Sequence, residues 1–481
     1  MIQPLASALA LVPALNAARV RFVHWKSNLR LAEGLAGETD LDLLVARSDA
    51  GTFRDAVREM GAVTIISQPW ASYPDVEDWL LLDGGSGKFL HLHVHYEIIT
   101  GLKRVKHLRL PWAATMLTHI RHDAKSGWPI PTPEMELIIL IVRIWAKMPP
   151  WRMVFGPRIP SHVLAELRWL EAAANPGEFA RLAQELDVPV TLPLGDEAAV
   201  LVQARAAYGK VMRFARMGWS QALLTAGRLN LRLFFTKVWL RHIGPTRYRK
   251  SLAFRGAMVA LVGSDGSGKS TASKALERWL RYKLDVHLIY MGSGDGRAGA
   301  INGLRRKVSA LVRKTGRPRK ARDEATVVRQ AGFVEKTYRL LDLHLVRRKL
   351  ALLRKARKLA DQGSIVLLDR YPQQQFKAIS DGPRQQDGRG FDWAARQELR
   401  LFDEAAQLGP DLVLKLKIDA AVALARKPDH ELEAIRAKCA ITDALVFARA
   451  ETVVIDAGES PEAVLMAAKL ALWSHVRRKQ Q

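Results

Sequence analysis

Cysteine is almost absent from this chain, because Cys439 is the only one among its 481 residues. A single thiol cannot form an intrachain disulfide, and it cannot build a zinc site of several cysteines. Those two kinds of stabilised domain are therefore excluded. A chain without disulfides is typical of a reducing compartment, so we expect a cytoplasmic location.

Long hydrophobic runs are also missing. The most apolar stretch, residues 137–145, contains Arg143 and falls far short of the ~20 residues that cross a bilayer. The apolar residues 1–20 lack the basic start of a secretion signal, and an amphipathic helix is the better interpretation. We therefore expect no transmembrane segment.

Acidic residues are few relative to basic ones. The chain has 48 Asp and Glu against 74 Lys and Arg, which gives a net charge of +26. The excess is concentrated in residues 301–360, where 19 basic and four acidic residues give a local charge of +15. Such a density indicates either contact with a polyanion, such as nucleic acid, anionic lipid or acidic glycan, or a solvated helical face. Composition leaves both interpretations open.

Three blocks follow one another along the chain. Residues 1–125 mix strand-like runs with short helical patterns and predict an α/β domain. Residues 126–248 carry helical periodicity and predict a helical extension that ends in a basic linker. Residues 249–481 alternate strands with helices, which predicts a doubly wound parallel sheet covered on both faces.

The linker carries aromatic residues among basic ones, including Phe234, Phe235 and Trp239. This pattern suits a buried helix, a plain connection or a helix in peripheral contact with a membrane. The sequence does not choose among the three.

The strongest motif lies at the start of the third block. An apolar strand, residues 258–262, runs into a G-x-x-x-x-G-K-S loop, and a helical pattern follows. Glycines let backbone N–H groups turn toward phosphates, and the helix N-terminus adds a positive dipole end. Lys269 is predicted to reach the β- and γ-phosphates of ATP, and the Ser270 hydroxyl to bind Mg²⁺. The predicted nucleotide-binding residues are Gly263, Ser264, Asp265, Gly266, Ser267, Gly268, Lys269, Ser270 and Thr271.

A second polar site is predicted at the end of the apolar strand 364–368, where Asp369 and Arg370 follow. Ligands bind at the carboxyl ends of strands in doubly wound sheets. Asp369 is therefore a candidate to organise Mg²⁺ or the attacking group. Arg370 is a candidate to hold the acceptor or the transferring phosphoryl group.

These motifs resemble those of thymidylate kinases, a family of P-loop nucleoside monophosphate kinases. SDGSGKST resembles the family's phosphate loop, LLDRYP its strand-ending D-R-[YF] motif, and PDLVLKLKIDAAVALARK the segment that leads into its mobile lid. The resemblance implies an ATP- and Mg²⁺-dependent kinase whose catalytic residues include Lys269, Asp369 and Arg370. It also implies that Arg426, with Lys427 or Arg436 as alternatives, stabilises transition-state charge.

The resemblance covers about residues 255–475, and it is lost around the acceptor. Val262 stands where the family has Glu before the loop, and residues 288–296 occupy the place of its acceptor loop. Residues 372–386 replace the stretch that contacts thymine. We therefore expect a nucleotide-like, sugar-like or glycan acceptor that differs from thymidylate.

Asp40 and Asp42 form a candidate metal site in the first block. They alternate on a strand, so both side chains point to one face, as a shared Mg²⁺ requires. HWKSN followed by ETDLDLLV resembles the nucleotidyltransferase fold superfamily, with Lys26-Ser27 in place of its Gly-Ser turn. The resemblance implies an N-terminal nucleotidyltransferase-like domain.

The third acid of that superfamily is expected on the strand 89–97, where His93 or His95 stands instead. This departure leaves open whether the domain catalyses a reaction or serves only to bind. His91, His93 and His95 also alternate on one face, either as metal ligands or as an exposed polar strand face.

Taken as a kinase, the chain transfers the γ-phosphoryl group of ATP to a small molecule or glycan. Two rivals remain open on the sequence: a true thymidylate kinase, and a nucleotide-gated binding protein that acts at a polyanion. The sequence does not determine the oligomeric state.

Overall fold

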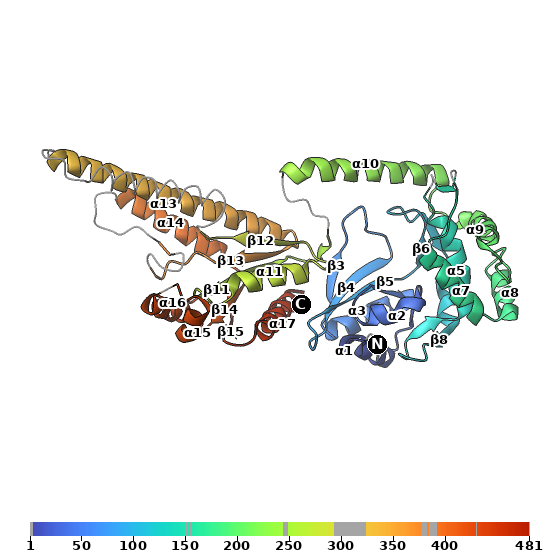
Figure 1. Ribbon diagram of the computed structural model, residues 1–481. Helices are drawn as coiled ribbons and strands as arrows, with labels where there is room; N and C mark the ends of the chain where they lie inside the picture. The colour runs from blue at the N-terminus through green and yellow to red at the C-terminus, as the bar shows by residue number, and fades with distance from the viewer. Residues whose placement is uncertain are drawn as a thin grey trace. The chain divides into compact units, whose positions relative to one another are not determined.

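The computed structural model describes residues 3–149, 152–153, 156–243, 249–292, 324–376, 382–383, 392–429 and 431–480. The chain divides into two compact units, Met1–Lys250 and Ser251–Gln481 (Figure 1). The division lies two residues beyond the predicted boundary at 248. The predicted α/β and helical blocks, residues 1–125 and 126–248, both fall within unit 1.

Unit 1 is built on a mixed sheet. The unit contributes five strands to it, in the order β1-β2-β5-β4-β3. β2 and β5 are parallel, and the other neighbours are antiparallel. The strands are β1 (Phe22–His24), β2 (Leu41–Val45), β3 (Val63–Ile66), β4 (Val76–Leu82) and β5 (Phe89–His95). Two further pairs are short: β6 (Ile98–Thr100) with β7 (Leu108–Leu110), and β8 (Ile120–His122) with β9 (Pro129–Pro131).

Helices of the N-terminal segment cover one face of this sheet. They are α1 (Ala6–Ala17), α2 (Leu31–Leu35) and α3 (Ala50–Glu59). Leu11 of α1 and Phe53 of α3 are fully buried in one cluster with Leu43 and Val94 of the sheet. Because side chains alternate along a strand, Asp42 and Leu44 point to the opposite face.

The helical part of unit 1 covers that opposite face. α5 (Pro133–Ala146) begins as predicted, with Thr132 accepting from the Met135 N–H at 3.4 Å and Pro133 in the first turn. Its residues share a buried cluster with Val23 and Leu44 of the sheet. α5 thus lies in the core, and the helical part is continuous with the α/β part. The remaining helices are α4 (Ala113–Thr118), α7 (Ser161–Ala173), α8 (Pro176–Glu185), α9 (Glu197–Val211) and α10 (Trp219–Ile243).

Unit 2 contains a five-stranded, wholly parallel sheet in the order β12-β13-β11-β14-β15. The strands are β11 (Ala257–Gly263), β12 (Val286–Tyr290), β13 (Ile365–Asp369), β14 (Leu412–Lys417) and β15 (Glu451–Asp456), preceded by the short β10 (Ser251–Leu252). β11, β13 and β14 are almost completely buried, as a parallel sheet covered on both faces requires.

Helices cover both faces of the unit 2 sheet. They are α11 (Lys269–Leu280), α13 (Glu324–Asp361), α14 (Asp392–Leu408), α15 (Ala420–Arg426), α16 (Leu432–Ala444) and α17 (Pro461–Gln480). α13 packs beside α14 (Figure 1) and buries Leu353 and Ala356 against Val366 of β13. α11 packs on α17, where Trp279 and Trp473 meet edge to face. The mixed α/β architecture and the parallel sheet agree with the prediction.

Among the described residues, no helix combines the length and the apolar character needed to cross a membrane. Much of the basic segment 301–360 lies outside the described residues: 301–323 are not described, and α13 begins at Glu324. The predicted polyanion contact of residues 301–360 therefore stays a prediction.

Candidate functional site

The phosphate-loop motif occupies the predicted turn between β11 and α11 in unit 2. Gly266 and Gly268 have φ values of +85° and +80°, which favour glycine. A Cβ atom at Gly266 would lie 2.8 Å from the carbonyl oxygen of Ala423. The loop therefore needs glycine for both backbone conformation and close packing, and it leads into the N-terminus of α11.

Lys269 lies inside this loop rather than on the surface. Its side chain is 9% exposed, and its Nζ donates a hydrogen bond to the Ser264 carbonyl oxygen at 2.6 Å. Burial, reinforced by the nearby Arg370 guanidinium, lowers the pKa of Lys269 to about 8. The ammonium group is thus held at the loop by a neutral carbonyl, which an anionic ligand would outcompete.

Asp369 and Ser270 meet because β13 and β11 are parallel neighbours whose carboxyl ends lie at one edge of the sheet. The Ser270 hydroxyl donates to Asp369 Oδ2 at 2.8 Å. The other oxygen, Asp369 Oδ1, is buried and has no hydrogen-bond partner. A hydroxyl beside a carboxylate with an unused oxygen is a donor set that suits Mg²⁺. Ser270 and Asp369, the metal ligands predicted in this unit, therefore fit that ion.

Three further charged groups surround the loop. Arg370 has a φ of +77°, an uncommon conformation for a non-glycine residue, and its Nη2 lies 4.0 Å from Asp265 Oδ1. Lys438 of α16 donates to Asp265 Oδ2 at 2.6 Å. Burial raises the pKa of Asp265, but Lys438, Lys269 and Arg370 together outweigh it, so the pKa is lowered overall. Asp265 therefore links the loop to Arg370 and to α16.

A cavity of about 300 Å³ adjoins these groups. The loop side contributes Ser264, Asp265 and Lys269, and helices α13 and α14 contribute the facing wall. The charged residues of that wall are Asp342, Arg348, Lys349 and Glu398. The basic helix α13 thus brings two cations to the same cavity as the phosphate loop.

The structure places Arg426 away from this cavity. Its guanidinium donates to the Ala457 carbonyl oxygen at 2.8 Å, and it is not among the residues that line the cavity. Lys438, on the next helix α16, does line it. Sequence reasoning missed Lys438 because one lysine on a helix carries no motif, and its partner Asp265 is 173 residues away.

The second predicted site is a polar row on the sheet of unit 1. Asp42 of β2 and Asp78 of β4 are both register partners of His93 on the central strand β5. Asp40 and Asp42 do share one face, but each has its own basic neighbour. Lys26 Nζ lies 2.6 Å from Asp42 Oδ1, and His91 Nδ1 lies 2.8 Å from Asp40 Oδ1.

Asp78 is the acidic residue that sequence reasoning did not find. It is buried, and it contacts both His91 (2.9 Å) and His93 (2.8 Å) as well as Lys250 (2.5 Å). The sequence has histidines, and no acid, at the position on strand 89–97 where the superfamily has its third acid; Asp78 lies beside His93 on the antiparallel neighbour β4. The apolar run that follows Asp78 in VEDWLLL was a usable strand signal, although the pairing of β4 with β5 was not evident.

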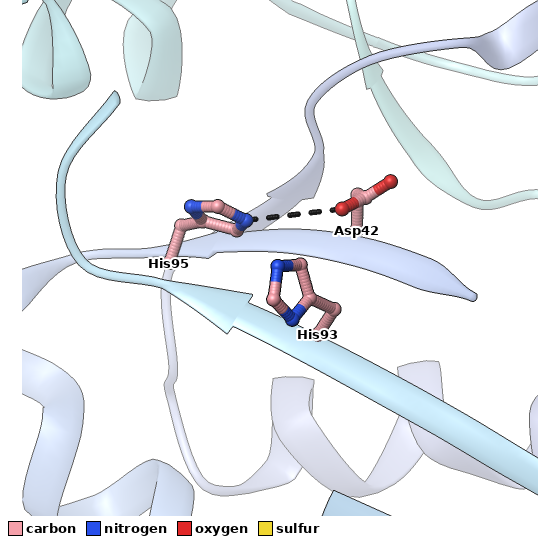
Figure 2. A group of neighbouring side chains, drawn as sticks. All are labelled: Asp42, His93 and His95. Atoms are coloured by element: carbon pink, nitrogen blue, oxygen red, sulfur yellow. Dashed lines mark ion pairs between the residues drawn. The ribbon is translucent and has the colours of Figure 1, made fainter. Parts of the chain in front are cut away.

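Asp42, His93 and His95 each hold one potential metal-ligating atom within 4.8 Å of the others. Figure 2 shows His95 pointing at Asp42, with 3.8 Å between Nε2 and Oδ1, and a ring nitrogen of His93 turned toward the same space. The donor set by itself suits a divalent ion. However, the Lys26 ammonium already contacts the same Asp42 oxygen. The positive charge beside Asp42 is therefore supplied by a lysine of the chain.

Comparison with known proteins gives relatives of similar length to unit 2. No family model matches the chain. The chain is 31% identical over 223 residues to an uncharacterized ATP-binding protein, YghS, of Escherichia coli K12; the match spans 45% of this chain and 92% of that protein. It is 29% identical over 228 residues to a second one, YghR, spanning 45% and 86%. A solved thymidylate kinase from Candida albicans matches with 19% identity and a TM-score of 0.26, over 44% of this chain and 88% of that one.

Proposed function

We propose that this chain, which belongs to the same protein family as the Escherichia coli ATP-binding protein YghS, is an ATP-dependent kinase. Unit 2 transfers the γ-phosphoryl group of ATP to a small anionic acceptor. The observation that carries the proposal is the cluster of Lys269, Ser270 and Asp369, with its unused buried oxygen, beside a cavity that continues past the loop.

Each side chain has a definite task in this proposal. Lys269 leaves the Ser264 carbonyl and contacts the β- and γ-phosphates. Ser270 and Asp369 hold Mg²⁺, which when bound supplies positive charge to the phosphate oxygens. Arg370 and Lys438 lie where charge develops during transfer. The acceptor oxygen attacks the γ-phosphorus directly as the bond to ADP breaks, so no covalent enzyme intermediate is required.

The charged side chains on the cavity wall opposite the phosphate loop indicate the class of acceptor. Arg348 and Lys349 of α13 face the space beside the phosphate loop, and paired cations favour a phosphate-bearing or acidic-sugar acceptor. Thymidylate is disfavoured because residues 288–296 and 372–386 differ from the thymidylate kinase pattern. A nucleotide-like or sugar-like acceptor, including an acidic glycan, fits the cavity's charge.

The test is a screen for ATP-dependent phosphate transfer over nucleoside monophosphates, sugar phosphates and acidic oligosaccharides. We expect one acidic class to be phosphorylated and thymidylate to be a poor acceptor. Catalytic efficiency with thymidylate of about 10⁴ M⁻¹s⁻¹ or above, the ordinary enzyme range, would identify a true thymidylate kinase. ATP hydrolysis stimulated by nucleic acid or anionic vesicles, with no phosphorylated product, would indicate a nucleotide-gated binding protein instead.

ATP binding should weaken as pH rises through about 8. The free chain holds the pKa of Lys269 at about 8, so the ammonium is charged below this pH and progressively lost above it. Because only the charged form stabilises phosphate, affinity should fall by up to about tenfold per pH unit above that value. Equilibrium binding of ATP at pH 7, 8 and 9 measures this, with Lys274→Ala, an exposed lysine of the same helix, as the control. A constant affinity over this range would contradict it.

A further inference from the structure

Unit 1 contains a second cavity, of about 520 Å³, that the kinase proposal does not use. It lies between the β1–β2 side of the sheet and the helices α5 and α7. Three acidic residues line it: Asp40, Asp42 and Glu166. Twice as many basic residues line it: Lys26, Arg30, Arg143, Lys147, Arg152 and Arg158. The lining therefore has a surplus of positive charge.

Arg143 is the most informative of these cations. Its side chain is only 9% exposed, and its Nε is buried without a hydrogen-bond partner. Across the described residues, its guanidinium has no ion pair; it lies 5.5 Å from the centroid of the Trp25 ring, and Glu166, Asp42 and Glu136 attract it from beyond ion-pair distance. A buried guanidinium that the fold leaves unpaired is costly, unless an anion binds it.

The acidic groups nearby compensate only in part for that charge: burial lowers the pKa of Arg143, and the opposing attraction of Glu166, Asp42 and Glu136 is too weak to reverse the shift. Asp42 is already neutralised by Lys26 at 2.6 Å, and the Asp40 carboxylate lies 2.8 Å from His91. A divalent ion on Asp42 would share its oxygen with the Lys26 ammonium and be repelled by it. The charge balance therefore favours an anion in the cavity over a metal ion at its edge.

Hydrogen bonds attach the loop that carries Lys26 to α5, the helix that carries Arg143. Asn28 donates two hydrogen bonds to Glu136 of α5, from its backbone N–H at 3.1 Å and its side-chain amide at 2.8 Å. This clamp fixes the loop that carries Lys26, in which Ser27 has a φ of +60°. Arg143 is seven residues after Glu136, so it lies on the same face of α5. The two cations are thus positioned before any ligand binds.

The cavity also has an apolar wall, formed by Leu140 and Ile144 of α5 and by Met148 just beyond its end. A volume of about 520 Å³ is typical of small-molecule sites. Several cations together with an apolar wall match a ligand that joins a multiply charged phosphate group to an organic body.

We propose that this cavity binds an organic di- or triphosphate without a divalent metal, with Lys26 and Arg143 contacting the phosphate oxygens. The Lys26 ammonium takes the role that a metal ion would otherwise have on Asp42. The site is separate from the phosphate loop of unit 2, so its failure and that of the kinase proposal are distinguishable.

The test uses the full chain carrying Lys269→Ala, in EDTA, titrated calorimetrically with ATP, inorganic pyrophosphate and citrate. We expect binding of ATP and pyrophosphate that falls at least tenfold when Arg143→Met is added. Lys147→Met should weaken it less, because Lys147 is exposed. Arg181→Met, an exposed arginine of α8 paired with Glu178 in its own helix, is the matched control and should bind like the parent.

Thermal unfolding distinguishes a ligand contact from a structural role. Without ligand, Arg143→Met should unfold at the same temperature as the parent or higher, because an unpaired buried charge has been removed. Pyrophosphate should then raise the unfolding temperature of the parent and of Arg181→Met, but not of Arg143→Met.

Four binding results would overturn the proposal. They are binding that requires Mg²⁺, equal binding by Arg143→Met and its parent, citrate binding as tight as that of pyrophosphate, and no binding by either phosphate probe. A lower unfolding temperature for ligand-free Arg143→Met would also overturn it, because the guanidinium would then be structural.

Discussion

Replacing Lys269 with alanine should lower the rate of phosphotransfer by about 10²–10³-fold while leaving the chain folded, because this ammonium stabilises charge on the phosphates. The side chain contacts the loop through one hydrogen bond to the Ser264 carbonyl, so little packing is lost. Initial rates at saturating ATP measure the effect, and circular dichroism reports the fold.

Lys274→Ala is the matched control for this experiment, since Lys274 is an exposed lysine on the same helix. It should retain the full rate. A Lys269→Ala chain that is folded and turns over at a rate close to the parent would rule out the proposed kinase mechanism.

Asp369→Asn should lower the rate by a similar factor, about 10²–10³-fold, and should raise the Mg²⁺ concentration needed for half-maximal activity. Asparagine can still accept the hydrogen bond from Ser270, but it lacks the negative charge that Oδ1 presents to the ion. The variant should be at least as stable as the parent, because a buried carboxylate oxygen without a partner has been replaced by a neutral group. Rates measured across a Mg²⁺ titration give both quantities.

The control for this change is Asp361→Asn, in which an exposed aspartate at the end of α13 loses its pairing with Arg255. Its Mg²⁺ dependence should match that of the parent. If Asp369→Asn reached half-maximal activity at the parent's Mg²⁺ concentration, Asp369 would not be a metal ligand.

The motif in unit 2 was predictable because its parts are local. The glycines, Lys269 and Ser270 are within eight consecutive residues, and the strand and helix beside them are marked by periodicity. Asp369 was predictable for a different reason: the carboxyl ends of parallel strands meet at one edge. The hydrogen bond from Ser270 to Asp369, across 99 residues, follows from that rule.

Arg426 illustrates what local pattern cannot decide. The resemblance to thymidylate kinases implies a lid cation at this position, yet the side chain points to the Ala457 carbonyl. Lys438 is the residue that reaches the loop, from the next helix. Which face of a short helix meets a distant loop depends on how α15 and α16 pack, and no spacing in the sequence encodes it.

In unit 1, too, local pattern predicted some features and tertiary packing decided others. The alternation of Asp40 with Asp42, and of His91 with His93 and His95, determined that these side chains share a sheet face, since the period of a strand is two. Only the tertiary structure decided their partners, because strand order places Asp78 beside His93 and packing places Lys26 on Asp42.

By itself, then, the sequence determined the phosphate loop, the parallel α/β character of the C-terminal unit and the polar strand face, all of which depend on short-range periodicity. The tertiary structure decided which charges are paired and which are buried alone. Arg143 appears in the sequence as an interruption in an apolar run. It becomes a candidate anion ligand only when α5 packs between the sheet and its neighbouring helices, because burial removes the water that would otherwise solvate its charge.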